Sequence, residues 1–176
     1  GLEDISDAIE WSLSAGFKWL VLAGDSAGAN LILAAMPRFR NDPRIRRVVA
    51  VYPVTDCDMT RPSYSAYSDG MLLRRSDMEW FFSHYCSPLQ RCDPAIAVLR
   101  GDLSGLPETL VVTAGFDVLR DEGRELVDVL RREGVMVSHV EAATLTHGFM
   151  RWQNIVTDAD RHISLVAQFI AGAQPD

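Results

Sequence analysis

The sequence predicts an α/β fold, in which a mostly parallel β-sheet is flanked by helices. Strand-like apolar runs alternate with helix-like segments along the chain, which is the order typical of parallel sheets. The runs are continuously apolar rather than alternating, as expected for strands covered on both faces. With 176 residues and 48% hydrophobic content, the chain has the size of one domain with a substantial core. We therefore expect residues 1–176 to form a single domain.

The first part of the chain predicts a helix, a strand and a second helix. Apolar residues recur on one helical face over Leu2–Ala15, which is followed by a glycine. A buried strand is predicted over Phe17–Ala23, and a helix of small and aliphatic residues over Ala29–Met36. Gly24–Gly28 separates the two, so the unit is a strand, a tight turn and a helix.

The remaining strands and helices follow the same alternation. Strands are predicted over Arg47–Tyr52, Thr109–Ala114 and Met136–Val140. A helical face runs through residues 119–130 and stops near a glycine, and a closing helix is predicted over Asp158–Ala171. These elements complete the predicted sheet and its helical layers.

A long segment, residues 54–106, separates the second and third predicted strands and is rich in Asp, Ser, Pro and Arg. Within it, Ser76 and Glu79 have the spacing of a capping box, which predicts a helix from there to about Tyr85. We interpret 54–106 as an insert, or partial cap, that lines a substrate pocket.

Composition and charge exclude several classes of function. Acidic residues outnumber basic ones by 24 to 17, and a net charge of −7 disfavours nucleic acid as a partner. No apolar stretch approaches the ~20 residues that a membrane helix needs. No metal-ligand cluster, phosphate-binding loop or dinucleotide fingerprint is present, so we expect no metal and no cofactor. Without a signal-like or transit-like segment, a cytoplasmic location is expected.

The clearest motif is the Gly-Asp-Ser-Ala-Gly sequence at Gly24–Gly28, where a predicted strand meets a predicted helix. A serine flanked by glycines at this junction is typical of a nucleophile elbow. The turn is strained, and only residues with small side chains let strand and helix approach so closely. A tight turn with an incidental serine at Ser26 is the alternative interpretation.

A nucleophilic serine requires a histidine to accept its proton and a carboxylate to orient that histidine. Asp117 follows the third predicted strand, and His147 lies on the loop after the fourth, in the order that this fold requires. Asp117 has the alternative of being only a helix cap. The competing acids and histidines lie within predicted helices or strands, namely Asp121, Glu122, His84, His139 and His162.

These segments resemble the hormone-sensitive-lipase-like family of α/β-hydrolase carboxylesterases. The family's elbow stands at Gly24–Gly28, its Asp-x-Leu-x-Asp-Glu segment begins at Asp117, and its His-Gly-Phe segment begins at His147. The resemblance implies that Ser26 is the nucleophile, His147 the general base and Asp117 its partner. It also implies that the backbone N–H of Ala27 binds the oxyanion. The expected reaction is hydrolysis of a carboxylic ester through an acyl-enzyme.

One departure from the family pattern concerns the oxyanion hole. The family has an upstream His-Gly-Gly-Gly segment that supplies further N–H donors, but this sequence has no two adjacent glycines. The first strands of the family's sheet are missing as well, which would leave an apolar strand at an open edge. We expect the chain to be the C-terminal portion of a longer enzyme. One missing oxyanion donor lowers kcat by about 10²–10³, so weak catalysis is expected of this portion alone.

The apolar residues of the insert favour a small, apolar ester substrate of short-to-medium acyl length. We expect substrate contacts at Asp25, Trp80, Phe81 and Phe149, with plain core packing as the alternative for the aromatic ones.

Other functions remain open from the sequence. The same triad serves amide, formamide and carbamate hydrolases, which differ in the pocket. A non-catalytic ligand-binding homologue and an inactive truncated product are further alternatives. A small-molecule ester is the expected partner, and a homo-oligomer is left open.

Overall fold

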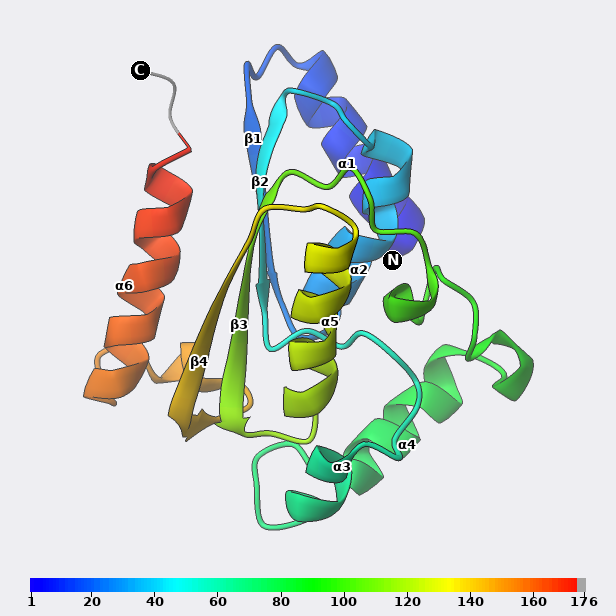
Figure 1. Ribbon diagram of the computed structural model, residues 1–176, viewed down its shortest axis with the longest axis vertical. Coiled ribbons are helices and arrows are strands. Elements are labelled where there is room, and N and C mark those ends of the chain that lie inside the picture. Colours follow the sequence, from blue (N-terminus) through cyan, green and yellow to red (C-terminus); the bar gives the residue numbers. More distant parts are fainter. Residues whose placement is uncertain (174–176) are drawn as a thin grey trace.

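The computed structural model describes residues 1–173 and contains one parallel four-stranded sheet in the order β1-β2-β3-β4 (Figure 1). The strands are β1 (Leu20–Asp25), β2 (Ile45–Val51), β3 (Glu108–Phe116) and β4 (Val137–Thr146). Sequential strands are neighbours throughout, and every pair is parallel. The predicted fold class is therefore confirmed.

Helices cover both faces of the sheet (Figure 1). One face carries α1 (Leu2–Ser14), α2 (Ala27–Ala35) and α5 (Arg120–Arg132), while α6 (Thr157–Ala171) lies on the other. A short 3₁₀ helix, Met36–Phe39, continues α2, and another, Phe149–Trp152, follows β4. Each helix-strand crossover returns the chain to the same end of the sheet, so the carboxyl ends of all four strands lie together.

The core has two halves separated by the sheet. Val48 and Ala50 of β2 face the side of α1, α2 and α5, whereas Val49 and Val51 face the side of α6. All four side chains are at most 3% exposed. This double burial explains why the strand is apolar at successive positions rather than at alternate ones.

The insert lies at the carboxyl edge of the sheet, between β2 and β3 (Figure 1). It contains α3 (Pro62–Ala66), α4 (Arg75–Tyr85) and two short 3₁₀ helices, Pro88–Gln90 and Val98–Arg100. Its own apolar cluster packs against residues that follow β3, which joins the insert to the rest of the core.

The predicted start of α4 was wrong. The helix begins at Arg75, and the Asp77 carboxylate accepts the backbone N–H of Arg74 at 2.9 Å, so Asp77 takes the place predicted for Glu79. Glu79 instead pairs with Arg75 at 3.1 Å, one helical turn earlier. An Asp carboxylate at the third helical position can accept the same backbone N–H as a Glu carboxylate. Overlapping capping patterns are therefore hard to distinguish in sequence.

The bounds of the other predicted elements also differ, and β2, for example, covers Ile45–Val51 rather than Arg47–Tyr52. β1 begins at Leu20 and continues to Asp25, and α2 begins at Ala27, so the turn between them occupies Ser26 alone. β4 continues to Thr146, well beyond its predicted end at Val140, because it stays paired with β3 as far as Phe116. Among residues 1–173, no helix is long and apolar enough to cross a membrane.

Candidate active site

The predicted site residues lie at the carboxyl ends of three parallel strands. Ser26 directly follows β1, Asp117 directly follows β3, and His147 directly follows β4. Because the parallel strands end at one edge of the sheet, side chains distant in sequence converge there. The structure brings together the three residues that the sequence predicted.

Ser26 occupies a strained turn between β1 and α2. Its φ of 53° lies in the left-handed region, which is uncommon for a residue with a side chain. A Cβ at Gly24 would lie 2.6 Å from the carbonyl carbon of Gly28, so only glycine fits there. The serine N–H donates to the Val51 carbonyl at 2.9 Å, which ties the turn to β2. Ser26 is thus held out from the strand in a fixed position.

A continuous hydrogen-bonded chain joins the three side chains. His147 Nε2 lies 3.0 Å from Ser26 Oγ, and His147 Nδ1 lies 2.8 Å from Asp117 Oδ2. The Asp117 side chain is 0% exposed and that of His147 is 11% exposed, so little water competes for these bonds. Asp117 Oδ1 also accepts the Leu119 N–H at 3.0 Å. Asp117 therefore combines the two interpretations that the sequence left open, the histidine partner and the local cap.

The competing histidines have other partners. His139 lies within β4 beside the Thr113 hydroxyl at 2.9 Å, and burial lowers the pKa of its imidazole. His162, on α6, lies 2.7 Å from the Asp158 carbonyl, and His84, on α4, lies 2.9 Å from the Trp80 carbonyl. None of the three makes a hydrogen bond to Ser26 or Asp117.

An apolar cavity of about 460 Å³ opens beside Ser26. Ala27 also lines it and is the first residue of α2, so its N–H has no partner inside the helix and lies at the positive end of the helix dipole. Most of the other lining residues belong to the insert, among them Leu73, Met78 and Phe82. The cavity thus places an apolar surface next to a hydroxyl and an N–H donor.

The predicted substrate contacts divide into two groups. Phe81 lines the cavity, but its neighbour Trp80 does not and is 59% exposed. Phe149 is fully buried and also lies outside the cavity lining, with its ring edge-on to Tyr52 at 5.3 Å. Asp25 is solvent-exposed and accepts the Tyr52 hydroxyl at 3.1 Å. The structure does not bring Trp80, Phe149 or Asp25 to the cavity.

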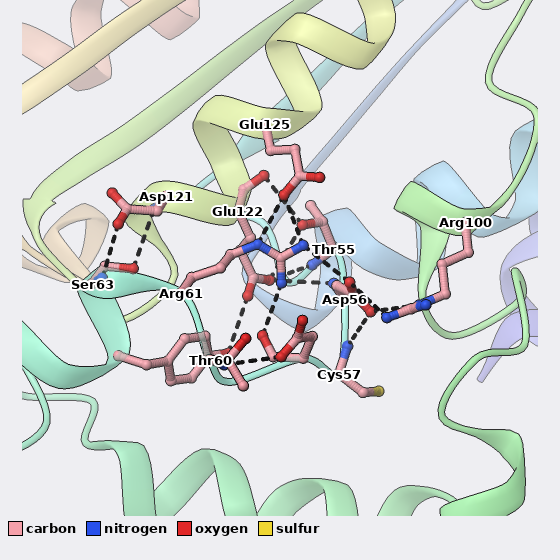
Figure 2. A network of polar contacts seen from close by, with 12 residues as sticks. Thr55, Asp56, Cys57, Thr60, Arg61, Ser63, Arg100, Asp121, Glu122 and Glu125 are labelled. Atoms are coloured by element: carbon pink, nitrogen blue, oxygen red, sulfur yellow. Dashed lines mark hydrogen bonds and ion pairs between the residues drawn. The ribbon is translucent and has the colours of Figure 1, made fainter.

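Sequence reasoning missed a polar network that anchors the insert to α5 (Figure 2). Glu122 is completely buried, and its Oε1 accepts the Thr55 N–H at 2.7 Å while its Oε2 accepts the Tyr64 hydroxyl at 3.1 Å. Burial raises the pKa of Glu122 to about 8. Arg61 bridges Asp56 and Glu125 at 3.0 Å and 2.8 Å. Glu122 lies three positions after Leu119 and four before Leu126, so the predicted helical periodicity of α5 places it on the apolar face, but that periodicity gave no sign of its hydrogen-bond partners in the insert.

No group of three or more His, Cys, Asp or Glu side chains within residues 1–173 is arranged to hold a metal ion. The chemistry available at the site is that of the serine, the imidazole, the carboxylate and backbone N–H groups.

An α/β sheet with a serine on a strained elbow, a carboxylate and a histidine at successive strand ends defines the class of α/β-hydrolases. A family model described as "alpha/beta hydrolase fold" matches residues 1–151. The chain belongs to the α/β-hydrolase family, in its hormone-sensitive-lipase-like branch of carboxylesterases, as the motifs predicted.

Similar curated proteins carry ester-hydrolase names. An ethyl acetate hydrolase of Pseudomonas putida is 34% identical over 179 residues, covering 94% of this chain and 56% of that protein. Carboxylesterase NlhH of Mycobacterium tuberculosis is 30% identical over 172 residues, covering 90% of this chain and 54% of that protein. The chain therefore spans only part of the length of these relatives.

Solved structures show the same architecture. EstE1, a thermophilic and thermostable carboxylesterase cloned from a metagenomic library, has a TM-score of 0.92 at 29% identity, covering 99% of this chain and 64% of that chain. A fungal esterase from Rhizomucor miehei has a TM-score of 0.88 at 29% identity, covering 98% of this chain and 58% of that chain.

Proposed function

We propose that this protein hydrolyses carboxylic esters of short-to-medium acyl length, with Ser26 as the nucleophile. The observation that carries the proposal is the hydrogen-bonded chain from Asp117 through His147 to Ser26 at the mouth of an apolar cavity. A serine hydroxyl is a weak nucleophile until an oriented imidazole takes its proton, and this geometry supplies that imidazole.

In the first half of the proposed reaction, Ser26 Oγ attacks the ester carbonyl carbon while His147 Nε2 accepts the hydroxyl proton. Asp117 Oδ2 accepts the Nδ1–H of the imidazole, so it fixes the tautomer and stabilises the imidazolium that forms. The tetrahedral intermediate then collapses, His147 returns the proton to the leaving alkoxide, and the alcohol departs. An acyl group remains on Ser26.

In the second half, a water molecule takes the place of the alcohol. His147 accepts a proton from it, the resulting hydroxide attacks the acyl carbonyl, and the carboxylic acid leaves as Ser26 Oγ regains its proton. The overall reaction consumes one ester and one water and releases one alcohol and one acid.

Ala27 supplies one oxyanion donor in this proposal, since its N–H lies at the free amino end of α2. By the family resemblance, further donors come from a His-Gly-Gly-Gly segment that these 176 residues do not contain. Loss of one oxyanion donor typically lowers kcat by about 10²–10³. We therefore propose that this chain alone is a weaker catalyst than a protein that also contains the segment.

The substrate class follows from the cavity and from the similar proteins. We propose that residues 54–106 form the pocket wall, since they supply Leu73, Met78, Phe81 and Phe82 to the lining. An apolar cavity of about 460 Å³ suits a small ester better than a long acyl chain. The name of the Pseudomonas putida relative, ethyl acetate hydrolase, favours the same size of substrate.

The test is a series of p-nitrophenyl esters from acetate to palmitate, with Ser26→Ala as the control. We expect release of p-nitrophenol that disappears in the variant and decreases with acyl length. A matching series of anilides tests the amide alternative, for which we expect much lower kcat/KM. The assay is made on this chain and on the natural protein that carries it. A folded natural protein without Ser26-dependent release of any ester would contradict the proposal.

Two further expectations stay predictions. A cytoplasmic location would be tested by fractionation of the source cells, and the oligomeric state by sedimentation.

A further inference from the structure

Among the four strands that residues 1–173 form, β2 has the one carboxyl end that the proposed mechanism does not use, and Tyr52 lies there. The proposed mechanism uses the residues that directly follow the other strands, namely Ser26 after β1, Asp117 after β3 and His147 after β4. Tyr52 directly follows β2 in the same way. Its side chain is 1% exposed, so it is part of the buried surroundings of the site rather than of the surface.

The Tyr52 ring packs directly against the His147 imidazole. The two ring centroids are 4.5 Å apart with an interplanar angle of 51°, and Phe149 supports the tyrosine from another side at 5.3 Å. Contact at this distance restricts rotation of the imidazole about its side-chain bonds. Such rotation would move Nε2 away from Ser26 and Nδ1 away from Asp117 together.

The Tyr52 hydroxyl binds the other side of the site. It donates to Asp25 Oδ2 at 3.1 Å, and Asp25 immediately precedes Ser26. The same residue therefore contacts the histidine through its ring and the serine turn through its hydroxyl.

The backbone at Tyr52 has an unusual conformation. Its φ is 34°, in the left-handed region, which is costly for a bulky residue and persists only where the surroundings enforce it. Its N–H donates to the Val112 carbonyl at 2.6 Å, and the preceding carbonyl, of Val51, accepts the Ser26 N–H at 2.9 Å. The strained residue is thus tied to the strands on both sides.

We infer that Tyr52 is a positioning residue that holds the imidazole of His147 and the turn of Ser26 in register for proton transfer. The inference rests on the proposed ester hydrolysis. Tyr52 exchanges no proton and touches no reacting bond. Its effect is to keep Nε2 of His147 within hydrogen-bonding distance of Ser26 Oγ through the catalytic cycle, a requirement to which rates are sensitive.

Two variants separate the contributions of the ring and the hydroxyl. Tyr52→Leu removes the ring contact with His147 and the bond to Asp25, whereas Tyr52→Phe keeps the ring and removes only the bond. Phe39→Leu is the matched control, because Phe39 is a buried aromatic residue in the core near α1 and α2 and does not contact the site. All three are made in the natural protein that carries this chain.

We expect Tyr52→Leu to lower kcat by about 10- to 100-fold with KM changed by less than about twofold, as for a misplaced catalytic group. Tyr52→Phe should recover most of this loss and stay within about tenfold of the parent, since only one hydrogen bond is missing. Phe39→Leu should leave kcat within about twofold. A second readout is the downfield NMR resonance of the His147 Nδ1–H, which we expect to broaden in Tyr52→Leu and to remain sharp in Tyr52→Phe.

The inference is overturned if Tyr52→Leu keeps the parental kcat and a sharp Nδ1–H resonance, or if Phe39→Leu loses as much kcat as Tyr52→Leu at equal folded fraction. Failure of the proposed function is a different result, namely the absence of Ser26-dependent turnover in the parent protein. The NMR comparison decides the role of Tyr52 in that case too, because it needs no substrate.

Discussion

Two buried carboxylates near the start of α5, Asp117 and Glu122, lie five positions apart in sequence and differ in what surrounds them. Asp117 faces an imidazole that itself reaches a serine at the edge of a cavity. Glu122 faces backbone N–H groups and a tyrosine hydroxyl inside a closed network, and it does not line the cavity (Figure 2). Both side chains are almost completely buried.

The difference shows that burial of an acid does not by itself indicate catalysis. What distinguishes Asp117 is its imidazole partner, which can exchange a proton with the serine hydroxyl. The hydrogen-bond donors around Glu122 only attach the insert to α5. Changes at Asp117 should therefore affect rate, and changes at Glu122 should affect stability.

The largest expected effect is on kcat in Asp117→Asn. The amide keeps the size of the side chain and its acceptor for the Leu119 N–H, but it no longer supports the imidazolium of His147. We expect kcat for p-nitrophenyl acetate to fall by about 10⁴, with a change in unfolding free energy below about 2 kcal/mol. A loss of less than about tenfold, measured with urea unfolding in parallel, would place the catalytic acid elsewhere.

The second prediction concerns the pH dependence of stability at Glu122. Burial raises its pKa from an ordinary 4.5 to about 8. Between pH 4.5 and about pH 8, the carboxyl is therefore protonated in the folded state and ionised in the unfolded state. The contribution of Glu122 to stability is therefore full below about pH 4.5 and is lost as the pH rises through about 8.

Glu122→Gln should remove this dependence. Between pH 5 and pH 9, we expect the parent to lose on the order of a few kcal/mol of unfolding free energy relative to the variant, measured by urea unfolding. Glu125→Gln, whose parent side chain is 48% exposed, serves as the control and should follow the parent. Equal slopes for the parent and Glu122→Gln would show that the Glu122 carboxyl is ionised throughout.

The third prediction compares two arginines that bind the same carboxylate. Arg61 and Arg100 each approach Asp56 at 3.0 Å, but their side chains are 14% and 41% exposed. We expect Arg61→Met to lower the unfolding free energy by about 2–4 kcal/mol and Arg100→Met by less than about 1 kcal/mol, because water screens the exposed pair. Thermal and urea unfolding measure both losses, and equal losses would refute the ranking by burial.

The smallest expected effect concerns the acyl-chain preference of the proposed esterase and two residues of α4. Phe81 lines the cavity and the adjacent Trp80 does not, so the two residues form a matched pair. Phe81→Ala should raise kcat/KM for octanoate relative to acetate by up to about tenfold, and Trp80→Ala by less than about twofold. If Trp80→Ala shifts the preference as much as Phe81→Ala, the cavity beside Ser26 is not the acyl pocket.

Much of the site could be predicted because its residues lie in short, recognisable sequence motifs. The glycines around Ser26 signal a turn that only glycine permits, and the order of serine, acid and histidine, with the acid and the histidine just after predicted strands, favours Asp117 and His147 over the competitors inside helices. The end of β4 was harder to predict. Its pairing with β3 continues to Thr146, and pairing depends on a partner strand far away in sequence.

The substrate-contact predictions show the same limit. Phe149 and Trp80 are aromatic residues near motifs or helix starts, and nothing local distinguishes a buried ring from one that lines a cavity. Phe149 is fully buried against Tyr52, and Trp80 is largely exposed, because of how α6 and the insert pack.

By itself, the sequence determined the alternation of strands and helices, the parallel sheet and the three residues that meet at its edge. These follow from periodicity, glycine geometry and the fixed direction of parallel strands, all of which act within short stretches of chain. Only the tertiary structure decided that Glu122 anchors the insert, that Phe81 rather than Trp80 lines the cavity, and that Tyr52 packs on His147. Those contacts join elements far apart in the chain, and packing rather than local pattern selects them.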